Sequence, residues 1–195
     1  MPTEREKMLA GEDYNARDPE LLAIARRARV LMAELNAIPA APPDVRHTLL
    51  DQLLGAAAEG AWVESPFHCD YGENVYVGKQ TFINMNCVFL DSAEIRIGEN
   101  GLIGPNVQLY TVSHPLRAAD RIVAGWTAAM GRSVYRTSAA PIQIGSSVWI
   151  GGGTIVMPGV TIGDNVTIGA GSIVTQDIPA NVLAFGQPCR VRQEL

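Results

Sequence analysis

The chain has 195 residues, a length that suits one domain, or one domain with a small appendage. Its hydrophobic content of 47% argues against disorder, and its net charge of −5 argues against nucleic acid as the main partner. No apolar run approaches the roughly 18 residues of a membrane span. Residues 1–11 also lack the apolar core of a signal peptide. We therefore expect a cytoplasmic protein with no membrane partner.

The three cysteines, Cys69, Cys87 and Cys189, cannot all pair with one another and are too widely spaced for a zinc knuckle. In a reducing cytoplasm such residues are usually small buried hydrophobic side chains. We therefore expect neither a disulfide framework nor a bound metal.

Residues 1–60 carry the signals of helices. Asp18-Pro19-Glu20 is a typical helix start, with Asp18 as the N-cap and Pro19 at the first helical position. Apolar residues at helical spacing then continue to about Asn36. Two prolines break this pattern, after which Asp44 can cap a second helix. We expect this segment to cover one open end of the β-structure that follows it.

From residue 77 onward an apolar residue returns every six positions, with a two-residue slip and one long interruption. A helix would give a period near 3.6 and an ordinary strand a period of 2, so neither explains the pattern. A period of six is typical of a parallel β-helix, in which short faces alternate with corners. The column residues are Val77, Ile83, Phe89, Ile97, Ile103, Leu109, Ile144, Ile150, Val156, Ile162, Ile168 and Val174.

The residue that follows each column member refines this picture. Glycine occupies two of every three such positions, except where Asn84 stands. Three hexads therefore form one coil of about 18 residues, and residues 61–195 are expected to form a triangular prism of about four coils. Glycine at these corners can serve a positive φ or a close backbone approach.

The repeat is interrupted between Tyr110 and Ile142, which predicts an inserted loop over residues 111–141. Loops this long in compact domains are usually functional. His114 lies at its root, and an imidazole that titrates near neutral pH suits a general base. Of the other histidines, His47 is expected to be solvated or to cap its helix, and His68 precedes the first predicted coil without an obvious partner.

Asn84 has two readings. It can be a turn asparagine that tolerates a positive φ. Its side chain can instead project from the prism to hold a substrate or the histidine. The residue pattern leaves both open.

The sequence resembles the maltose/galactoside O-acetyltransferases of the hexapeptide-repeat superfamily, including the nodulation acetyltransferases. The resemblance covers almost the whole chain, and its ordered set of motifs is more specific than the hexapeptides alone. The motifs are residues 3–12 (TEREKMLAGE), 69–72 (CDYG), 82–86 (FINMN), 113–115 (SHP), 144–152 (IGSSVWIGG), 158–165 (PGVTIGDN) and 186–190 (GQPCR).

This resemblance implies a left-handed parallel β-helix, an all-β core with an N-terminal α-helical cap, assembled as a homotrimer with active sites between neighbouring prisms. It implies acetyl transfer from acetyl-CoA to a hydroxyl of a sugar or glycoside, with His114 as general base and no acyl-enzyme. Asn84 and Asp70 match residues that contact the sugar, and Asp91 is a further candidate.

For the acetyl donor, the resemblance implies that the backbone N–H of Gly152 binds the developing oxyanion. Ala170, Thr175 and Gln176 match residues along the pantetheine path, although Gln176 replaces a common lysine. Arg190 matches a residue near the phosphates of CoA, and Trp149 is expected to pack beside the active site.

The chain departs from the family in the inserted loop, which is longer and more apolar. It contains Ile122, Val123, Trp126 and Met130 in the region that contacts the acceptor in the family. We therefore expect the loop to set acceptor choice and to make the acceptor pocket more apolar.

Three other functions were weighed. A γ-type carbonic anhydrase needs three histidines on zinc, and only His68 and His114 lie in or beside the prism, so we reject it. A non-catalytic trimeric scaffold is disfavoured by Asn84, His114 and the C-terminal motif. A different acceptor, such as an antibiotic, an amino sugar or a lipo-oligosaccharide, stays open.

Overall fold

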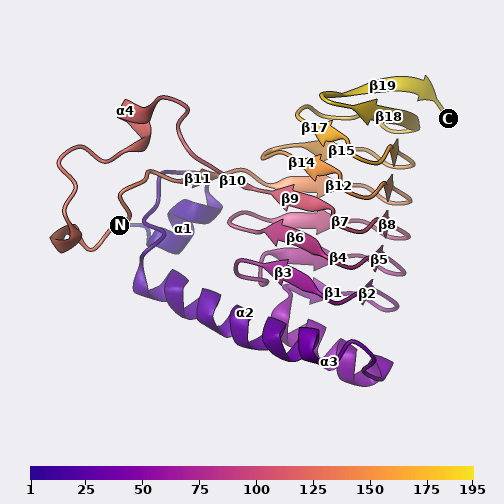
Figure 1. The fold of residues 1–195 in the computed structure, drawn as a ribbon, viewed down its shortest axis with the longest axis horizontal. Helices are drawn as coiled ribbons and strands as arrows, with labels where there is room; N and C mark the ends of the chain where they lie inside the picture. Colours follow the sequence, from indigo (N-terminus) through magenta and orange to yellow (C-terminus); the bar gives the residue numbers. More distant parts are fainter.

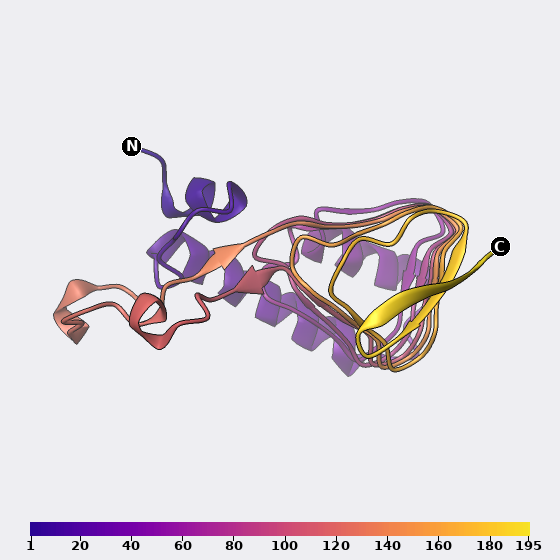
Figure 2. The same cartoon turned by 90° about the horizontal axis from the view of Figure 1, so that it is seen from above.

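The computed structural model describes residues 1–195 and contains a left-handed parallel β-helix. Short strands wind into a triangular prism, helices lie across one end, and a long loop projects to one side (Figure 1). Viewed along the stack, the coils superpose, and the N-terminal segment and the loop extend from the same side of the prism (Figure 2). No helix is both long enough and apolar enough to cross a membrane.

Three parallel sheets form the faces of the prism, and each is named here by its first strand. The β1 sheet contains β1 (Ala56–Ala57), β4 (Val75–Val77), β7 (Ile95–Ile97), β12 (Ile142–Ile144) and β15 (Thr161–Ile162). The β2 sheet contains β2 (Trp62–Val63), β5 (Phe82–Ile83), β8 (Leu102–Ile103), β13 (Trp149–Ile150), β16 (Thr167–Ile168), β18 (Val182–Gly186) and the antiparallel β19 (Cys189–Glu194). The β3 sheet contains β3 (Phe67–Cys69), β6 (Cys87–Leu90), β9 (Gln108–Tyr110), β14 (Ile155–Val156) and β17 (Ile173–Val174).

The prism has about six coils, so the expectation of about four was wrong. The predicted column is present, and its members from Val77 to Val174 are all buried. The first coil was missed because Ala57 and Cys69 hold its column positions and are too small to read as a hydrophobic repeat. His68 accordingly lies within that coil, exposed on β3.

The corner glycines are required by close packing between coils. A Cβ on Gly78 would lie 2.5 Å from the carbonyl carbon of Gly98, and one on Gly104 would lie 2.6 Å from the nitrogen of Gly152. Positive φ falls elsewhere in the corners, for example at Asn86 (62°). Of the two roles open to the corner glycines, close backbone approach is therefore the one that operates at these positions.

We number the corners by the sheets that they join: the first runs from the β1 to the β2 sheet, the second from β2 to β3, and the third from β3 to the next coil. At the third corner, eight positions separate Cys69 from Val77 and Phe89 from Ile97, where other corners use six. One coil later the inserted loop leaves the same corner. The two-residue slip and the loop are thus variations of one site on the prism.

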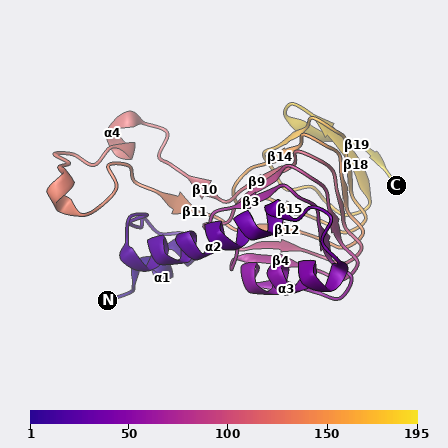
Figure 3. The same cartoon turned by 60° about the horizontal axis from the view of Figure 1, so that its bottom comes forward.

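Helices α1 (Glu4–Leu9), α2 (Pro19–Ala37) and α3 (Pro43–Leu53) form the cap, and α2 and α3 cross the end of the prism (Figure 3). Asp18 caps α2 as predicted, since its Oδ1 accepts a 2.9 Å hydrogen bond from the Glu20 N–H. The expectation that Asp44 caps the next helix was wrong. Pro43 already starts α3, so Asp44 lies inside the first turn and makes no cap.

A buried arginine joins the cap to the first coil. Arg46 is fully buried, and its guanidinium donates to the carbonyl oxygens of Val63 and Pro39 at 2.8 Å each. The charge also lies 5.1 Å from the ring centre of Trp62. These contacts hold α3 and the end of α2 against β2, so the cap is a fixed part of the molecule.

Candidate active site

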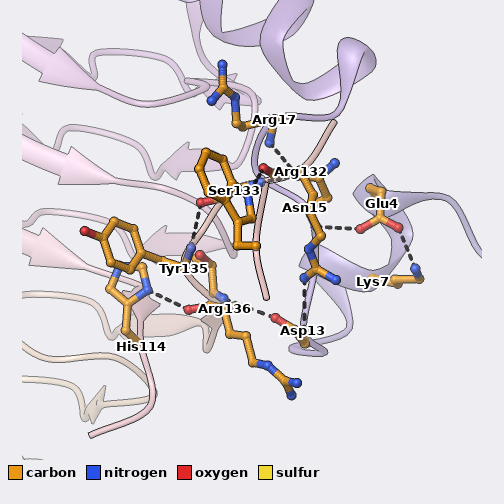
Figure 4. A network of polar contacts seen from close by, with 12 residues as sticks. Glu4, Lys7, Asp13, Asn15, Arg17, His114, Arg132, Ser133, Tyr135 and Arg136 are labelled. Atoms are coloured by element: carbon orange, nitrogen blue, oxygen red, sulfur yellow. Dashed lines mark hydrogen bonds and ion pairs between the residues drawn. The ribbon is translucent and has the colours of Figure 1, made fainter. Parts of the chain in front are cut away.

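The root of the inserted loop is a short antiparallel pair. Strand β10 (Val112–Ser113) pairs with β11 (Ser138–Ala139), which brings the outgoing and returning arms together. Immediately beyond this pair, Nδ1 of His114 lies 2.8 Å from the carbonyl oxygen of Arg136 (Figure 4). A carbonyl oxygen can only accept, so Nδ1 carries the proton of the neutral ring. Nε2 is then the basic nitrogen, and the exposed imidazole can present it to a ligand.

His114 lines a cavity of about 290 Å³ between the prism, helix α2 and the loop. Its polar lining includes Arg29, Asp70, Ser92 and Tyr135 as well as His114. Helix α2, which supplies Arg29, and the segment before it also supply the apolar residues Ala16, Leu21, Leu22 and Ala25. Polar and apolar groups around one small cavity suit a polyhydroxylated ligand.

The third corner supplies two carboxyl groups to this region. Asp70 is half-buried and lines the cavity; burial raises its pKa, and the Arg29 guanidinium opposes that rise. Asp91 is fully buried one coil above it. Burial raises the pKa of Asp91 to about 6, and the nearby Asp70 charge adds to the effect. Asp91, expected to contact the sugar, therefore lies behind the cavity wall, and Asp70 forms part of its surface.

The returning arm of the loop is fastened to the N-terminal segment. The Asn15 side chain donates to the Gly131 carbonyl oxygen and accepts from the Ser133 N–H, each at 3.1 Å (Figure 4). The Tyr14 N–H donates to the Thr137 carbonyl oxygen at 3.1 Å. These bonds place Tyr135 beside His114, with 6.2 Å between the ring centres.

The cavity is not lined by Ile122, Val123, Trp126 or Met130, the apolar loop residues expected to shape it. Val112, at the root of the loop, does line it. Ile122 and Met130 are exposed, and the Trp126 indole N–H donates to the Arg132 carbonyl oxygen within the loop. Helix α4 (Ala118–Arg121) and the 3₁₀ turn η1 (Ala128–Met130) extend away from the prism (Figure 1). Within the protomer, the apolar lining comes mainly from α2 and the segment before it, where sequence analysis indicated no site.

Asn84 lies at the second corner and does not line the His114 cavity. Its φ is not positive, so Asn84 is not the turn asparagine with a positive φ that the sequence allowed. Asn86, two residues later, has the positive φ. The Asn84 Oδ1 accepts a 2.8 Å hydrogen bond from the Met85 N–H, and its half-buried side chain keeps its amide N–H groups free of partners within the chain. One chain therefore does not bring Asn84 and His114 together.

The residues expected to bind the donor lie along the upper coils. Gly152 sits at the second corner beside Pro105, and its N–H donates to no atom of the chain. Ala170 is exposed one coil above it, while Thr175 and Gln176 are exposed at the third corner after β17. Arg190 is exposed on β19, and Trp149 faces outward from the β2 sheet. These positions occupy two different corners and are not gathered in one cavity.

Most residues of the cavity escaped sequence analysis, among them Tyr14, Arg29, Tyr71, Ser92 and Tyr135. Of these five, only Tyr71 lay inside a recognised motif. Ser92 lies at a corner of the repeat, and the other three come from segments without a repeat, which tertiary contacts bring to the cavity. No cluster of three or more histidine, cysteine or acidic side chains could hold a metal ion.

Comparison with known proteins places the chain in a family. Residues 7–58 match the maltose acetyltransferase hexapeptide capping motif, and residues 141–176 match the bacterial transferase hexapeptide repeats. Nodulation protein L of Rhizobium meliloti (strain 1021) is 46% identical over 190 residues, covering 97% of this chain and 98% of that protein. The chain belongs to the maltose/galactoside O-acetyltransferase family.

Solved structures of this hexapeptide-repeat family agree. A maltose O-acetyltransferase from Clostridium difficile 630 superposes with a TM-score of 0.91 at 42% identity, covering 100% of this chain and 98% of that one. A hexapeptide-repeat acetyltransferase from Vibrio cholerae, solved with acetyl-coenzyme A, gives a TM-score of 0.87 at 38% identity, covering 100% and 99%. The prediction of an acetyl-CoA-dependent acetyltransferase is confirmed.

Proposed function

We propose that this acetyltransferase moves the acetyl group of acetyl-CoA to a hydroxyl of a sugar or glycoside, with His114 as general base. The observation that carries the proposal is the 2.8 Å bond from His114 Nδ1 to the Arg136 carbonyl oxygen. It fixes the tautomer of the neutral ring, in which Nε2 is the basic nitrogen, and the ring lines a cavity with Asp70, Ser92 and Tyr135. An acceptor hydroxyl held there by hydrogen bonds lies within reach of a base.

The reaction is a direct transfer. Nε2 takes the proton of the acceptor hydroxyl as its oxygen attacks the thioester carbonyl carbon. The tetrahedral intermediate then collapses, the C–S bond breaks, and the imidazolium returns a proton to the departing thiolate of CoA. The products are an O-acetylated acceptor and free CoA. None of the three cysteines can serve as a competing nucleophile, since all are buried.

The donor is proposed to lie along the upper coils. The free N–H of Gly152 suits the negative charge that develops on the thioester oxygen, a contact typically worth about 10²–10³-fold in rate. Ala170, Thr175 and Gln176 would follow the pantetheine, and Arg190 would meet a phosphate group. Trp149 is proposed to lie beside the acetyl group.

We propose that the enzyme is a homotrimer with one active site between each pair of prisms. Asn84 and His114 are on different corners of one chain, so a second protomer must supply one of them if both contact the acceptor. The outer face of the β2 sheet also carries an apolar column in register, which we call the outer column. It consists of Trp62, Phe82, Leu102 and Trp149.

An acceptor screen tests this function. Free CoA is measured with a thiol reagent in the presence of acetyl-CoA and a panel of glycosides, amino sugars and aminated antibiotics. The buried cysteines keep the background low. Glycosides should release CoA well above the acceptor-free rate, and mass spectrometry should find an acetyl ester. Release only with amine acceptors would contradict the sugar assignment.

A further inference from the structure

Asp91 is a carboxylate without a cation. Its side chain is fully buried at the third corner and makes no ion pair. Oδ2 is buried and has no hydrogen-bond partner. Burying an unpaired carboxylate is unfavourable, and ionisable groups in such surroundings are concentrated at functional sites.

The single bonded oxygen of Asp91 holds the coil below. Oδ1 accepts hydrogen bonds from the backbone N–H groups of Asp70 and Tyr71, each at 2.9 Å. The Asn74 side chain returns along the same corner and donates to the Asp91 carbonyl oxygen at 2.7 Å. The corner from Asp70 to Asn74 is thus fastened at both ends to one residue.

The residues held in this way belong to the acceptor cavity. Asp70 and Tyr71 both line it, and so does Ser92, the residue after Asp91. Thr111 forms a comparable contact one coil higher, where its hydroxyl accepts from the Ala93 N–H at 2.9 Å. That hydroxyl holds one N–H group, whereas the carboxylate of Asp91 holds two adjacent ones. The carboxylate of Asp91 therefore holds the backbone of two consecutive residues, from which the Asp70 and Tyr71 side chains extend.

We infer that Asp91 is a positioning residue for the acceptor. It sets Asp70 and Tyr71 against the ligand without touching the ligand itself. This inference rests on the proposed function, since it assigns the cavity beside His114 to the acceptor. It predicts that loss of Asp91 weakens acceptor use and leaves the donor site, on the upper coils, unchanged.

The test compares Asp91→Ala and Asp91→Asn with wild type, using an aryl β-galactoside as the acceptor. The alanine variant should raise the acceptor KM by about tenfold or more and leave the KM for acetyl-CoA within about twofold. The asparagine variant should stay within about threefold of wild type for both, because its amide oxygen can still accept from both N–H groups. A rise in both KM values, or in neither, would overturn the inference.

Thr81→Val is the matched control. The Thr81 hydroxyl is buried at the first corner, where it accepts from the Gly101 N–H at 2.9 Å and donates to the Gly98 carbonyl oxygen at 2.7 Å. Removing it should lower the melting temperature and leave both KM values unchanged. An acceptor KM that rises as much in this variant as in Asp91→Ala would mean that general loosening of the prism explains the effect.

A measurement without turnover separates this inference from the proposed function. Wild type that acetylates no glycoside would count against the function. Amide hydrogen exchange then tests Asp91 directly by comparing Asp91→Ala with wild type. Asp91→Ser replaces the alanine variant if that variant does not fold. The serine side chain also removes the contact, because it is too short to reach both N–H groups. Exchange at Asp70 and Tyr71 should quicken by about tenfold or more relative to other corner amides. Unchanged exchange would overturn the inference.

Discussion

At the scale of single residues, the site depends on contacts between side chains and backbone. His114 is oriented by a carbonyl oxygen, Asp70 by the carboxylate of Asp91, and the loop arm by the amide of Asn15. Backbone partners do not change with the sequence of the residue that supplies them. The orientation of His114 therefore tolerates substitution at Arg136 but not displacement of its chain.

His114→Ala tests the general base. We expect kcat to fall by about a hundredfold or more, since general-base catalysis contributes about 10²–10⁴-fold. The fold should persist, because the ring is exposed and makes its one hydrogen bond to a carbonyl oxygen. Circular dichroism and light scattering provide the control. A folded variant with nearly normal turnover would remove His114 from the mechanism.

Asp91→Asn should also change how stability depends on pH. Because the folded-state pKa of Asp91 is about 6 and its ordinary value is 3.8, the folded protein holds this proton more tightly than the unfolded chain does. The contribution of Asp91 to wild-type stability should therefore fall as pH rises from about 4 to about 6, by roughly 3 kcal/mol, and stay constant above that range.

The asparagine variant lacks this titration, while Asp70 and Arg29 are common to both proteins. The difference in unfolding free energy between variant and wild type, measured by urea denaturation, should therefore grow in favour of asparagine across this range. A difference independent of pH would show that Asp91 keeps an ordinary pKa in the folded protein.

Sequence reasoning reached His114 through its place at the loop root and Asp70 through a family motif. It could not reach Tyr14, Arg29 or Tyr135. The bonds that position their segments join distant parts of the chain, as Asn15 and Ser133 do across 118 positions. No local pattern records such a pairing.

At the scale of elements, the hexad column predicted the coils from Val77 to Val174, because aliphatic side chains stacked in a narrow prism leave a strict period. It missed the first coil, where Ala57 and Cys69 fill the column, and the last, where Ala184 does. Those coils are held by neighbours that the period does not describe: α3 below, and the β18–β19 hairpin above.

Helix α2 should determine any preference for an apolar acceptor group. Leu22 is half-buried and lines the cavity, so Leu22→Asn should reduce the advantage of an aryl over a methyl glycoside in kcat/KM by about 1–2 kcal/mol. Val30→Asn on the same helix is the control, since Val30 is exposed and lies outside the cavity.

The inserted loop provides a competing explanation for a preference for apolar acceptor groups. A variant with serine in place of Ile122, Val123, Trp126 and Met130 removes the apolar side chains of the loop. It keeps the bonds of Asn15 to Gly131 and Ser133. This variant should keep the aryl preference, because none of the four side chains lines the cavity in the protomer. Loss of the preference here and its retention in Leu22→Asn would return acceptor choice to the loop.

At the scale of the whole molecule, the prism presents three different outer faces. The β2 sheet carries the outer column, in which Leu102 is 46% exposed and Trp149 is 53% exposed. The β1 sheet instead shows Arg96, Gln143 and Thr161. Exposed apolar side chains aligned over several coils are typical of an interface.

Leu102→Glu should therefore break the proposed homotrimer into monomers and abolish most activity, as measured by light scattering and CoA release. A buried carboxylate at the centre of an apolar interface has no partner and strongly disfavours association. Gln143→Glu, a charge on the β1 sheet, should leave both assembly and turnover unchanged. An active monomer in either variant would contradict the trimeric active site.

The bond between His114 and Arg136 joins residues 22 positions apart, and the β10–β11 pair closes the chain just behind it. Whatever lies between them begins and ends at one fixed point. Doubling the length of a flexible loop adds only about 0.6 kcal/mol to the free-energy cost of closing it. Insertions and deletions there can accumulate during evolution while the imidazole stays in place, so the length of this excursion can change without displacing the proposed general base.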